Sequence, residues 1–279
     1  MRKEAAKKTF FKLLQILFLI YTVILCVGPF LWVIFSSFKS NKEILDSAFA
    51  LPSGFAFDGY RRALDMAPIF KFFGNSLFVS VVNTVISVLL VSMAAYALAR
   101  YEFRGKKLFT TMLSSSLLIP VSALLMPIYL IMSRVNLLDR RAGLILVYAA
   151  LGLPTSLFIL RGTFLNIPRE IDEAAAIDGA SPLRIFFYVI MPMSKAGLAT
   201  AATLHFLTSW NEFMFALVLT KREAIRTLPL ALNYFSSQFS FDYTAMFAAI
   251  TMSMLPSILV FILLQEQITS SMVAGSVKG

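Results

Sequence analysis

Hydrophobic and polar positions divide the chain into long apolar runs separated by polar connections. Six of these runs approach the roughly 20 residues that an α-helix needs to cross a bilayer. They are the segments 13–35, 73–99, 108–132, 143–160, 198–219 and 245–264. A membrane β-barrel would show many segments of about ten alternating residues, and none is present. The pattern therefore predicts an all-α membrane protein, a six-helix bundle over residues 13–264.

Prolines interrupt several of the predicted spans. They are Pro29, Pro120, Pro127, Pro154 and Pro256. Proline removes a backbone donor and kinks a helix, which a helical bundle tolerates when its neighbours satisfy the freed groups. We therefore expect bends in these spans.

The composition agrees with a membrane protein. The chain is 58% hydrophobic and 14% charged, whereas soluble domains average about 45–50% and roughly 25%. A soluble enzyme, a disordered tail and a disulfide-stapled secreted module are thereby excluded. The single cysteine, Cys26, lies in the first apolar run, so no disulfide framework or CxxC metal site exists.

The net charge of +10 is informative about topology. In a soluble protein it would suggest nucleic acid, but in a membrane protein short basic segments stay cytoplasmic. Residues 1–12 carry five Lys/Arg against one Glu, and residues 100–107 carry four Lys/Arg. Both termini are therefore predicted to be cytoplasmic. The first run is longer than a signal-peptide core and lacks a clear cleavage site, so we expect an uncleaved span.

This topology places three segments outside the membrane. They are residues 36–72, 133–142 and 220–244. The first and last are long, with mixed charge and aromatic residues. They could form a folded cap over the bundle or a docking surface for an outside partner, and the sequence leaves both open.

Two spans carry polar residues at helical spacing. In the second span these are Ser80, Asn83, Thr84 and Ser87, and in the fifth they are His205, Thr208, Ser209 and Glu212, with Asn211 alongside. For the second-span stripe we favour hydrogen bonds between helices. A carboxylate within a span usually faces a bundle interior or a water-filled cavity. We therefore take Asn83, Ser209, Asn211 and Glu212 as candidate residues of a translocation path.

No catalytic signature accompanies these polar residues. His205 is the only histidine, and nothing marks an acid and a serine that would converge on it. The sequence contains no HExxH, no Walker loop and no GxGxxG. We therefore expect no enzyme activity, and neither a metal nor a cofactor bound by this chain.

The connection between the fourth and fifth spans, residues 164–193, reads as two short helices exposed to the cytoplasm. Pro168 suits the start of the first helix, and Asp178-Gly179 breaks it. Ser181-Pro182 begins the second helix, which Pro192 is expected to end. Apolar faces are expected at Ile171, Ala174 and Ala175 of the first helix and at Leu183, Phe186, Phe187 and Ile190 of the second.

This connection resembles a known family loop. Glu173-Ala174-Ala175, then Gly179, then Val189-Ile190-Met191-Pro192 resemble the EAA loop of ABC importer permeases. The spacing is that of the family, with Val189 and Met191 replacing isoleucine and leucine.

Further segments are similar to the sugar branch of that family. They are Asn75-Ser76-Leu77, Ala94-Ala95-Tyr96-Ala97-Leu98-Ala99-Arg100 and Trp210-Asn211-Glu212-Phe213. The tail 274–279 is similar to that of the smaller permease of maltose-type systems.

The resemblance implies a carbohydrate importer permease in the plasma (inner) membrane of a bacterium or archaeon. Its partners would be a second homologous permease, two cytoplasmic ATPase subunits that bind ATP and magnesium, and an extracytoplasmic binding protein that delivers a sugar or oligosaccharide. No nucleic acid is implied.

The family's functional residues map onto two segments of this chain. The ATPase-coupling loop would comprise Glu173, Ala174, Ala175, Asp178, Gly179 and Pro192. The tail 265–279, with Gly275, Lys278 and Gly279, would reach toward the ATPase.

Two alternatives to a sugar permease remain open. One is an ABC permease for a non-sugar solute. The other is a secondary transporter, although such folds often show internal repeats and charged residues near the midplane. For the connection 164–193 taken by itself, an amphipathic linker on the bilayer surface is a further alternative.

Overall fold

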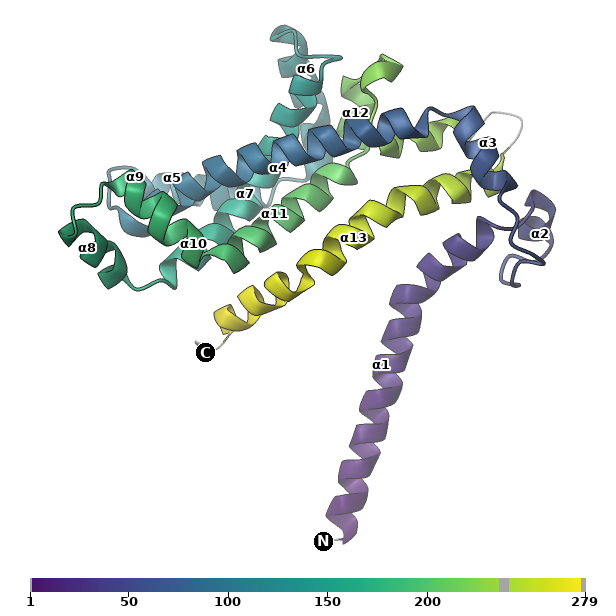
Figure 1. The fold of residues 1–279 in the computed structure, drawn as a ribbon, viewed down its shortest axis with the longest axis horizontal. Coiled ribbons are helices and arrows are strands. Elements are labelled where there is room, and N and C mark those ends of the chain that lie inside the picture. The colour runs from purple at the N-terminus through teal and green to yellow at the C-terminus, as the bar shows by residue number, and fades with distance from the viewer. Residues whose placement is uncertain (1, 236–240, 277–279) are drawn as a thin grey trace. The chain divides into compact units, whose positions relative to one another are not determined.

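The computed structural model of the chain describes residues 2–235 and 241–276, with no side-chain detail at 2–6, 264 and 266–276. Its elements are helices (Figure 1). The long helices are α1 (Arg2–Ser36), α4 (Ile69–Arg100), α7 (Arg141–Leu165), α11 (Lys195–Trp210) and α13 (Tyr243–Ser276). The shorter elements are α2 (Asn41–Asp46), α3 (Asp58–Met66), α5 (Lys106–Ser116), η1 (Val121–Leu124), α6 (Leu125–Arg134), α8 (Arg169–Ile177), α9 (Pro182–Ile185), η2 (Phe186–Ile190), α10 (Met191–Met193), α12 (Met214–Leu219), η3 (Glu223–Ile225) and η4 (Leu228–Tyr234).

Within the described residues, four helices are long and apolar enough to span a membrane by themselves. They are Lys7–Ser36, Ile69–Arg100, Arg141–Leu165 and Tyr243–Leu263. The number rises to six if two bent pairs each form one span. The bend is 103° between α5 and the η1–α6 segment, and 82° between the segment Pro182–Met193 and α11.

Two of the predicted spans are not continuous helices. The run 108–132 breaks after α5, and Pro120 directly precedes η1 at this break. A proline has no N–H for the helical ladder, and it disfavours helical angles at the residue before it. The run 198–219 ends as a helix at Trp210 and restarts at Met214. Pro29, Pro154 and Pro256 instead lie inside helices that continue past them.

The chain divides into two compact units, residues 1–69 with 231–254 and residues 70–230 with 255–279. In the first unit, residues 36–69 fold on themselves around Phe38. Phe38 contacts the rings of Phe55, Phe57 and Tyr60 at 5.3–5.6 Å between centroids. The ammonium of the buried Lys39 donates to the carbonyls of residues 47 and 48, at 3.2 and 3.0 Å.

In the second unit, α7 and α11 pack closely through glycines (Figure 1). A Cβ on Gly152 would lie 2.2 Å from His205, and one on Gly197 would lie 2.2 Å from Thr163. His205 is buried beside Ser156, with 3.3 Å between Nδ1 and Oγ. The small residues therefore let the two helices approach, as is common between membrane helices.

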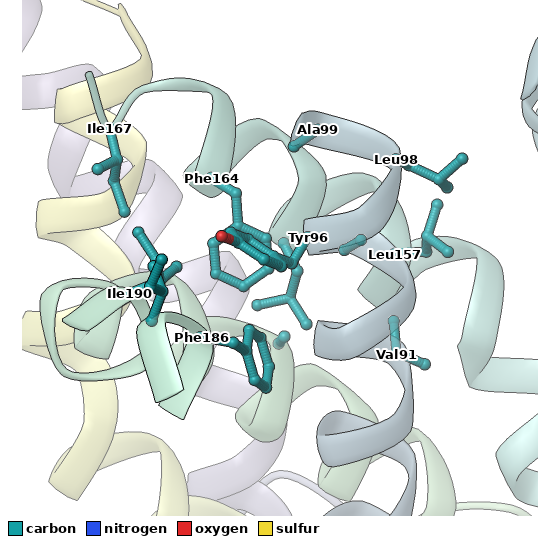
Figure 2. Close-up of a cluster of buried hydrophobic side chains, with 13 residues drawn as sticks. Val91, Tyr96, Leu98, Ala99, Leu157, Phe164, Ile167, Phe186 and Ile190 are labelled. Carbon is teal, nitrogen blue, oxygen red and sulfur yellow. The ribbon is translucent and has the colours of Figure 1, made fainter. Parts of the chain in front are cut away.

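Two apolar clusters stabilise opposite ends of this bundle. One contains Val79, Leu144, Tyr148 and Phe215, from α4, α7 and α12. The other, drawn in Figure 2, brings together Tyr96 of α4, Phe164 of α7 and Phe186 and Ile190 of the segment 164–193. This second cluster fixes that segment against the ends of α4 and α7.

Candidate functional site

The segment 164–193, called here the coupling loop, projects from one end of the second unit (Figure 1). Its first helix, α8, follows Pro168 and carries Glu170 and Asp172 in its first turn. Acidic side chains there interact favourably with the positive end of the helix dipole. The second helical run begins at α9, where the Ser181 hydroxyl accepts the backbone N–H of Arg184 at 3.4 Å. Both helix starts agree with the prediction.

The turn between α8 and α9 depends on Gly179. Its φ is +81°, in the left-handed region that favours glycine. The N–H of Ala180 donates to the carbonyl of Ala175, and that of Gly179 to the carbonyl of Ala176, both at 3.0 Å. This is the Schellman arrangement that satisfies the last carbonyls of a helix. The predicted break at Asp178-Gly179 is confirmed.

The two faces of α8 have different surroundings. Ile171 and Ala175 pack against the apolar cluster of Figure 2. Glu173, Ala174 and Ile177 are exposed, and Ile177 is 86% exposed. The predicted apolar face of residues 171, 174 and 175 is therefore divided, because Ile171 and Ala175 face the cluster whereas Ala174 is exposed.

The predicted apolar face of the second helical run is only partly buried. Phe186 and Ile190 are buried, whereas Leu183 and Phe187 are 62% and 42% exposed, and Ile185, which was not assigned to that face, is buried. Residues Phe186–Ile190 form a π-helical turn, in which hydrogen bonds run from i to i+5 and the side-chain period differs from that of an α-helix. Pro192 lies within the last turn, which continues to Met193.

Asp172 joins α8 to the end of α4. The Tyr96 hydroxyl donates to its Oδ1 at 2.5 Å, and Nη2 of Arg100 lies 2.8 Å from its Oδ2. The three side chains border a cavity of about 330 Å³, together with Arg169 and Glu173. Sequence reasoning did not select Asp172 as a site residue, although Tyr96 and Arg100 belong to the family-like segment that closes the second span.

The candidate path residues lie in two environments. Asn83 and Ser209 are buried, and Asn83 Oδ1 accepts the Ser87 hydroxyl at 3.1 Å. Asn83 Nδ2 and Ser209 Oγ have no hydrogen-bond partner among the described residues. Asn211, at the end of α11, is exposed, and its Nδ2 donates to the carbonyl of Leu207 at 2.9 Å.

Glu212 lies at the break between α11 and α12. Its carboxylate accepts the N–H groups of Phe215 and Ala216, at 2.7 and 2.9 Å, and the Tyr148 hydroxyl at 2.9 Å. It thus satisfies the free donors that begin α12, a role that acidic side chains fill at helix starts. This contact explains how a helix can restart within an apolar run.

Polar contacts at the opposite end of the second unit hold the segment that follows α12. Asn75 donates to the carbonyls of residues 224 and 226, at 3.0 and 2.9 Å, and accepts from Arg141 at 2.7 Å. The Ser76 hydroxyl accepts the N–H of Leu228 at 2.7 Å. The family-like Asn75-Ser76 pair therefore anchors a neighbouring segment, which its sequence alone did not reveal.

Asp139 holds the same segment from the loop between α6 and α7. It accepts the N–H groups of Lys221 and Arg222, both at 2.9 Å, and Nε of Arg222 at 2.6 Å. Burial raises the pKa of Asp139, but the Arg222 and Lys221 N–H groups and the Arg222 guanidinium outweigh it, so the pKa lies below its usual value. The carboxylate is therefore ionised at neutral pH, where it holds the backbone at Lys221 and Arg222.

The predicted tail residues are only partly within the described structure. Gly275 lies in the last turns of α13. Lys278 and Gly279 lie outside the described residues.

Comparisons with known proteins agree with this architecture. Residues 87–273 match the family described as "Binding-protein-dependent transport system inner membrane component". The chain is 38% identical over 264 residues to the diacetylchitobiose uptake system permease of Streptomyces coelicolor, covering 94% of this chain and 87% of that protein. It is 35% identical to the trehalose transport system permease of Mycobacterium tuberculosis, covering 99% of each chain.

A solved structure has a similar fold. A chain of a bacterial ABC transporter that imports the acidic polysaccharide alginate superposes with a TM-score of 0.81 at 25% identity, covering 93% of this chain and 97% of that one. The predicted all-helical permease fold is confirmed, and a secondary transporter is excluded by the family match. The chain belongs to the binding-protein-dependent inner-membrane permeases of ABC importers, a family of transport components rather than enzymes.

Proposed function

We propose that the chain forms half of the transmembrane path of an ATP-driven importer of a sugar or oligosaccharide. A second homologous permease supplies the other half, and two cytoplasmic ATPase subunits bind the coupling loops. The carbohydrate assignment is supported by relatives that are named for diacetylchitobiose and trehalose uptake. A non-sugar solute remains the alternative.

The observation that carries this proposal is the two-sided environment of α8. One face packs on the ends of α4 and α7, whereas the opposite face presents Glu173, Ala174 and Ile177 without cover. A short helix with small and acidic exposed residues suits a cleft in a protein partner. A helix lying on the bilayer surface would instead carry basic residues on its polar face.

The mechanism is alternating access driven from the cytoplasm. ATP binding closes the ATPase pair and moves both coupling loops inward, and the two permeases rock between inward- and outward-facing states as rigid bodies. The chain itself hydrolyses nothing. With both termini cytoplasmic, the outer cap that includes α2 and α3 meets the sugar-loaded binding protein.

The proposed path includes Asn83, Ser209, Asn211 and Glu212. Asn211 is the candidate sugar contact, because its side chain is exposed at the break after α11. Glu212 would act through the backbone, since its oxygens are bonded to α12 and Tyr148.

The test is transport by the complete complex, co-expressed with its partner permease, ATPase and binding protein. Glu173→Gln and Gly179→Pro should lower transport and sugar-stimulated ATPase activity while the subunit stays in the membrane. Proline fixes φ near −65°, whereas position 179 has φ +81°. Gly162→Ala is the matched control, because a Cβ at Gly162 meets nothing within 4 Å.

Two outcomes would contradict the proposal. Full transport by the Gly179→Pro variant would refute the coupling role of the loop. A substrate screen with sugars of increasing length and with amino acids tests the solute: uptake of an amino acid alone would replace the carbohydrate assignment with the alternative.

A further inference from the structure

The carboxylate of Asp172 differs from the other acidic groups of α8 in its surroundings. Asp172 points toward α4, where both of its oxygens meet side chains of that helix, Tyr96 and Arg100. These two residues are four apart, so they lie on one face of the last turns of α4. Its neighbour Glu173 is exposed. Adjacent acidic residues thus face the membrane bundle and the outside, respectively.

Burial makes the contact of Asp172 with Arg100 difficult to break. The side chains of Arg100 and Asp172 are only 6% and 16% exposed. Nε and Nη2 of Arg100 and Oδ2 of Asp172 are also buried and form no hydrogen bond among the described residues, so the contact between Arg100 and Asp172 is an ion pair alone. Loss of the carboxylate would leave a guanidinium out of water without its counter-ion, which is strongly unfavourable. We therefore expect the ion pair between Arg100 and Asp172 to remain formed while α8 moves.

Tyr96 extends the same contact to the other arm of the coupling loop. Its hydroxyl bonds to Asp172, while its ring lies 5.3 Å from the ring of Phe186 and 6.0 Å from that of Phe164, between centroids. Figure 2 shows Tyr96, Phe164 and Phe186 in one cluster. One residue of α4 therefore touches α8, the second helical run of the loop and the end of α7.

We infer that Asp172, Arg100 and Tyr96 form a rigid joint that carries the displacement of α8 into α4 and remains closed throughout the transport cycle. The inference rests on the proposed function, in which the ATPase displaces α8. Glu173 engages the ATPase, whereas Asp172 is a positioning residue that passes the movement to the span. Without the joint, α8 moves while α4 lags behind.

The test uses the complete complex in lipid nanodiscs and proteoliposomes, with Asp172→Asn as the main variant. The amide keeps the shape and removes the charge. The complex should assemble, and the sugar transported per ATP hydrolysed should fall by roughly 2- to 30-fold, the range of coupling changes seen for residues that link sites. Glu102→Gln is the matched control, because Glu102 is an exposed carboxylate just beyond α4 whose ion pair is with Lys106 and not with Asp172 or Tyr96.

A distance measurement separates a joint from a merely structural contact. Spin labels are placed at Leu90 of α4 and Glu170 in the first turn of α8, both exposed, with the exposed Cys26 replaced by serine. Their separation within one subunit should stay narrow and unchanged between the nucleotide-free and ATP-trapped complexes. In the Asp172→Asn variant it should broaden or shift when ATP is trapped.

The outcomes distinguish this inference from the proposed function. Normal coupling and unchanged distances in the Asp172→Asn variant would overturn the joint, and a change of the separation in the unsubstituted complex would also do so. Failure of the unsubstituted subunit to bind the ATPase would instead overturn the proposed function. If Asp172→Asn prevents assembly, Tyr96→Phe decides: it keeps the ring and should lower coupling, and normal coupling refutes the joint.

Discussion

At the residue scale, the polar side chains of the family-like segments hold other segments of the chain in place. Asn75 and Ser76 hold the segment around residues 224–228, and Glu212 begins α12. Tyr96 and Arg100 hold Asp172. Such contacts use the fixed directions of short polar side chains in a medium where unpaired polar groups are costly. This explains why these particular residues are used at these positions.

Glu43 of α2 makes a similar set of contacts. These contacts predict that the stability of the fold depends on pH. The Ser53 hydroxyl bond is the largest cause, followed by the N–H and hydroxyl of Ser40, and together they lower the pKa of Glu43 from 4.5 to about 2. A carboxyl with a lowered pKa in the folded state stabilises the fold above its unfolded pKa, and this contribution is lost as the pH falls through the folded one.

We expect Glu43→Gln to lower the thermal unfolding midpoint of the purified subunit at pH 7. The difference from the unsubstituted subunit should shrink as the pH falls from 4.5 toward 2, since both then carry an uncharged side chain at position 43. Ser53→Ala should reproduce part of the effect. A difference that is constant over this pH range would contradict the assigned role of the charge.

At the element scale, a glycine turn and a π-helical turn interrupt the regular helices of the coupling loop. Gly179 permits the turn after α8, and the π-helical turn Phe186–Ile190 rotates the buried face of the next run. In contrast, α7 and α11 are each continuous helices, and glycines let them approach closely.

The contact of Gly152 with His205 predicts an effect on stability. Gly152→Ala would place a Cβ 2.2 Å from the imidazole, so the ring or the helices must move. Overpacking of this kind costs about 1–3 kcal/mol, and we expect a lower unfolding midpoint in detergent. His205→Ala should relieve this cost in the double variant, and Gly162→Ala should be close to neutral. An equal effect of Gly152→Ala and Gly162→Ala would refute the close approach.

At the scale of the whole molecule, the chain matches its carbohydrate-permease relatives over nearly its full length. The polypeptide is also similar in fold to an alginate transporter subunit at only 25% identity. The arrangement of helices therefore tolerates broad replacement of residues along the chain. Within the second unit, the basic connection 100–107 begins at the end of α4, where the coupling loop also packs.

Membrane topology provides the prediction at this scale. In a Cys26→Ser background, Phe49→Cys should react with a membrane-impermeant maleimide in spheroplasts, because Phe49 is 90% exposed in the outer segment. Lys107→Cys, in the basic connection, should react only after permeabilisation. Labelling of both variants in intact spheroplasts, or the reverse pattern, would contradict the cytoplasmic assignment of the termini.

The sequence by itself determined the all-helical membrane fold, the positions of the apolar runs and the two-helix coupling loop. These depend on local features: run length, proline and glycine positions, and capping residues. The resemblance of short segments also indicated the family, although not what those segments do.

Only the tertiary structure decided which side chains meet. Hydrogen bonds of Asp172 with Tyr96, of Asn75 with residues 224 and 226, and of Asp139 with Arg222 join positions far apart in the chain, as does the ion pair of Asp172 with Arg100. Periodicity describes the faces of one helix but not the neighbour that each face meets. It also failed at the π-helical turn and at the break before α12, where backbone hydrogen bonds depart from the regular ladder. The contacts of Asp172 with Tyr96 and Arg100 therefore depend on how α8 packs on α4, which no local sequence pattern specifies.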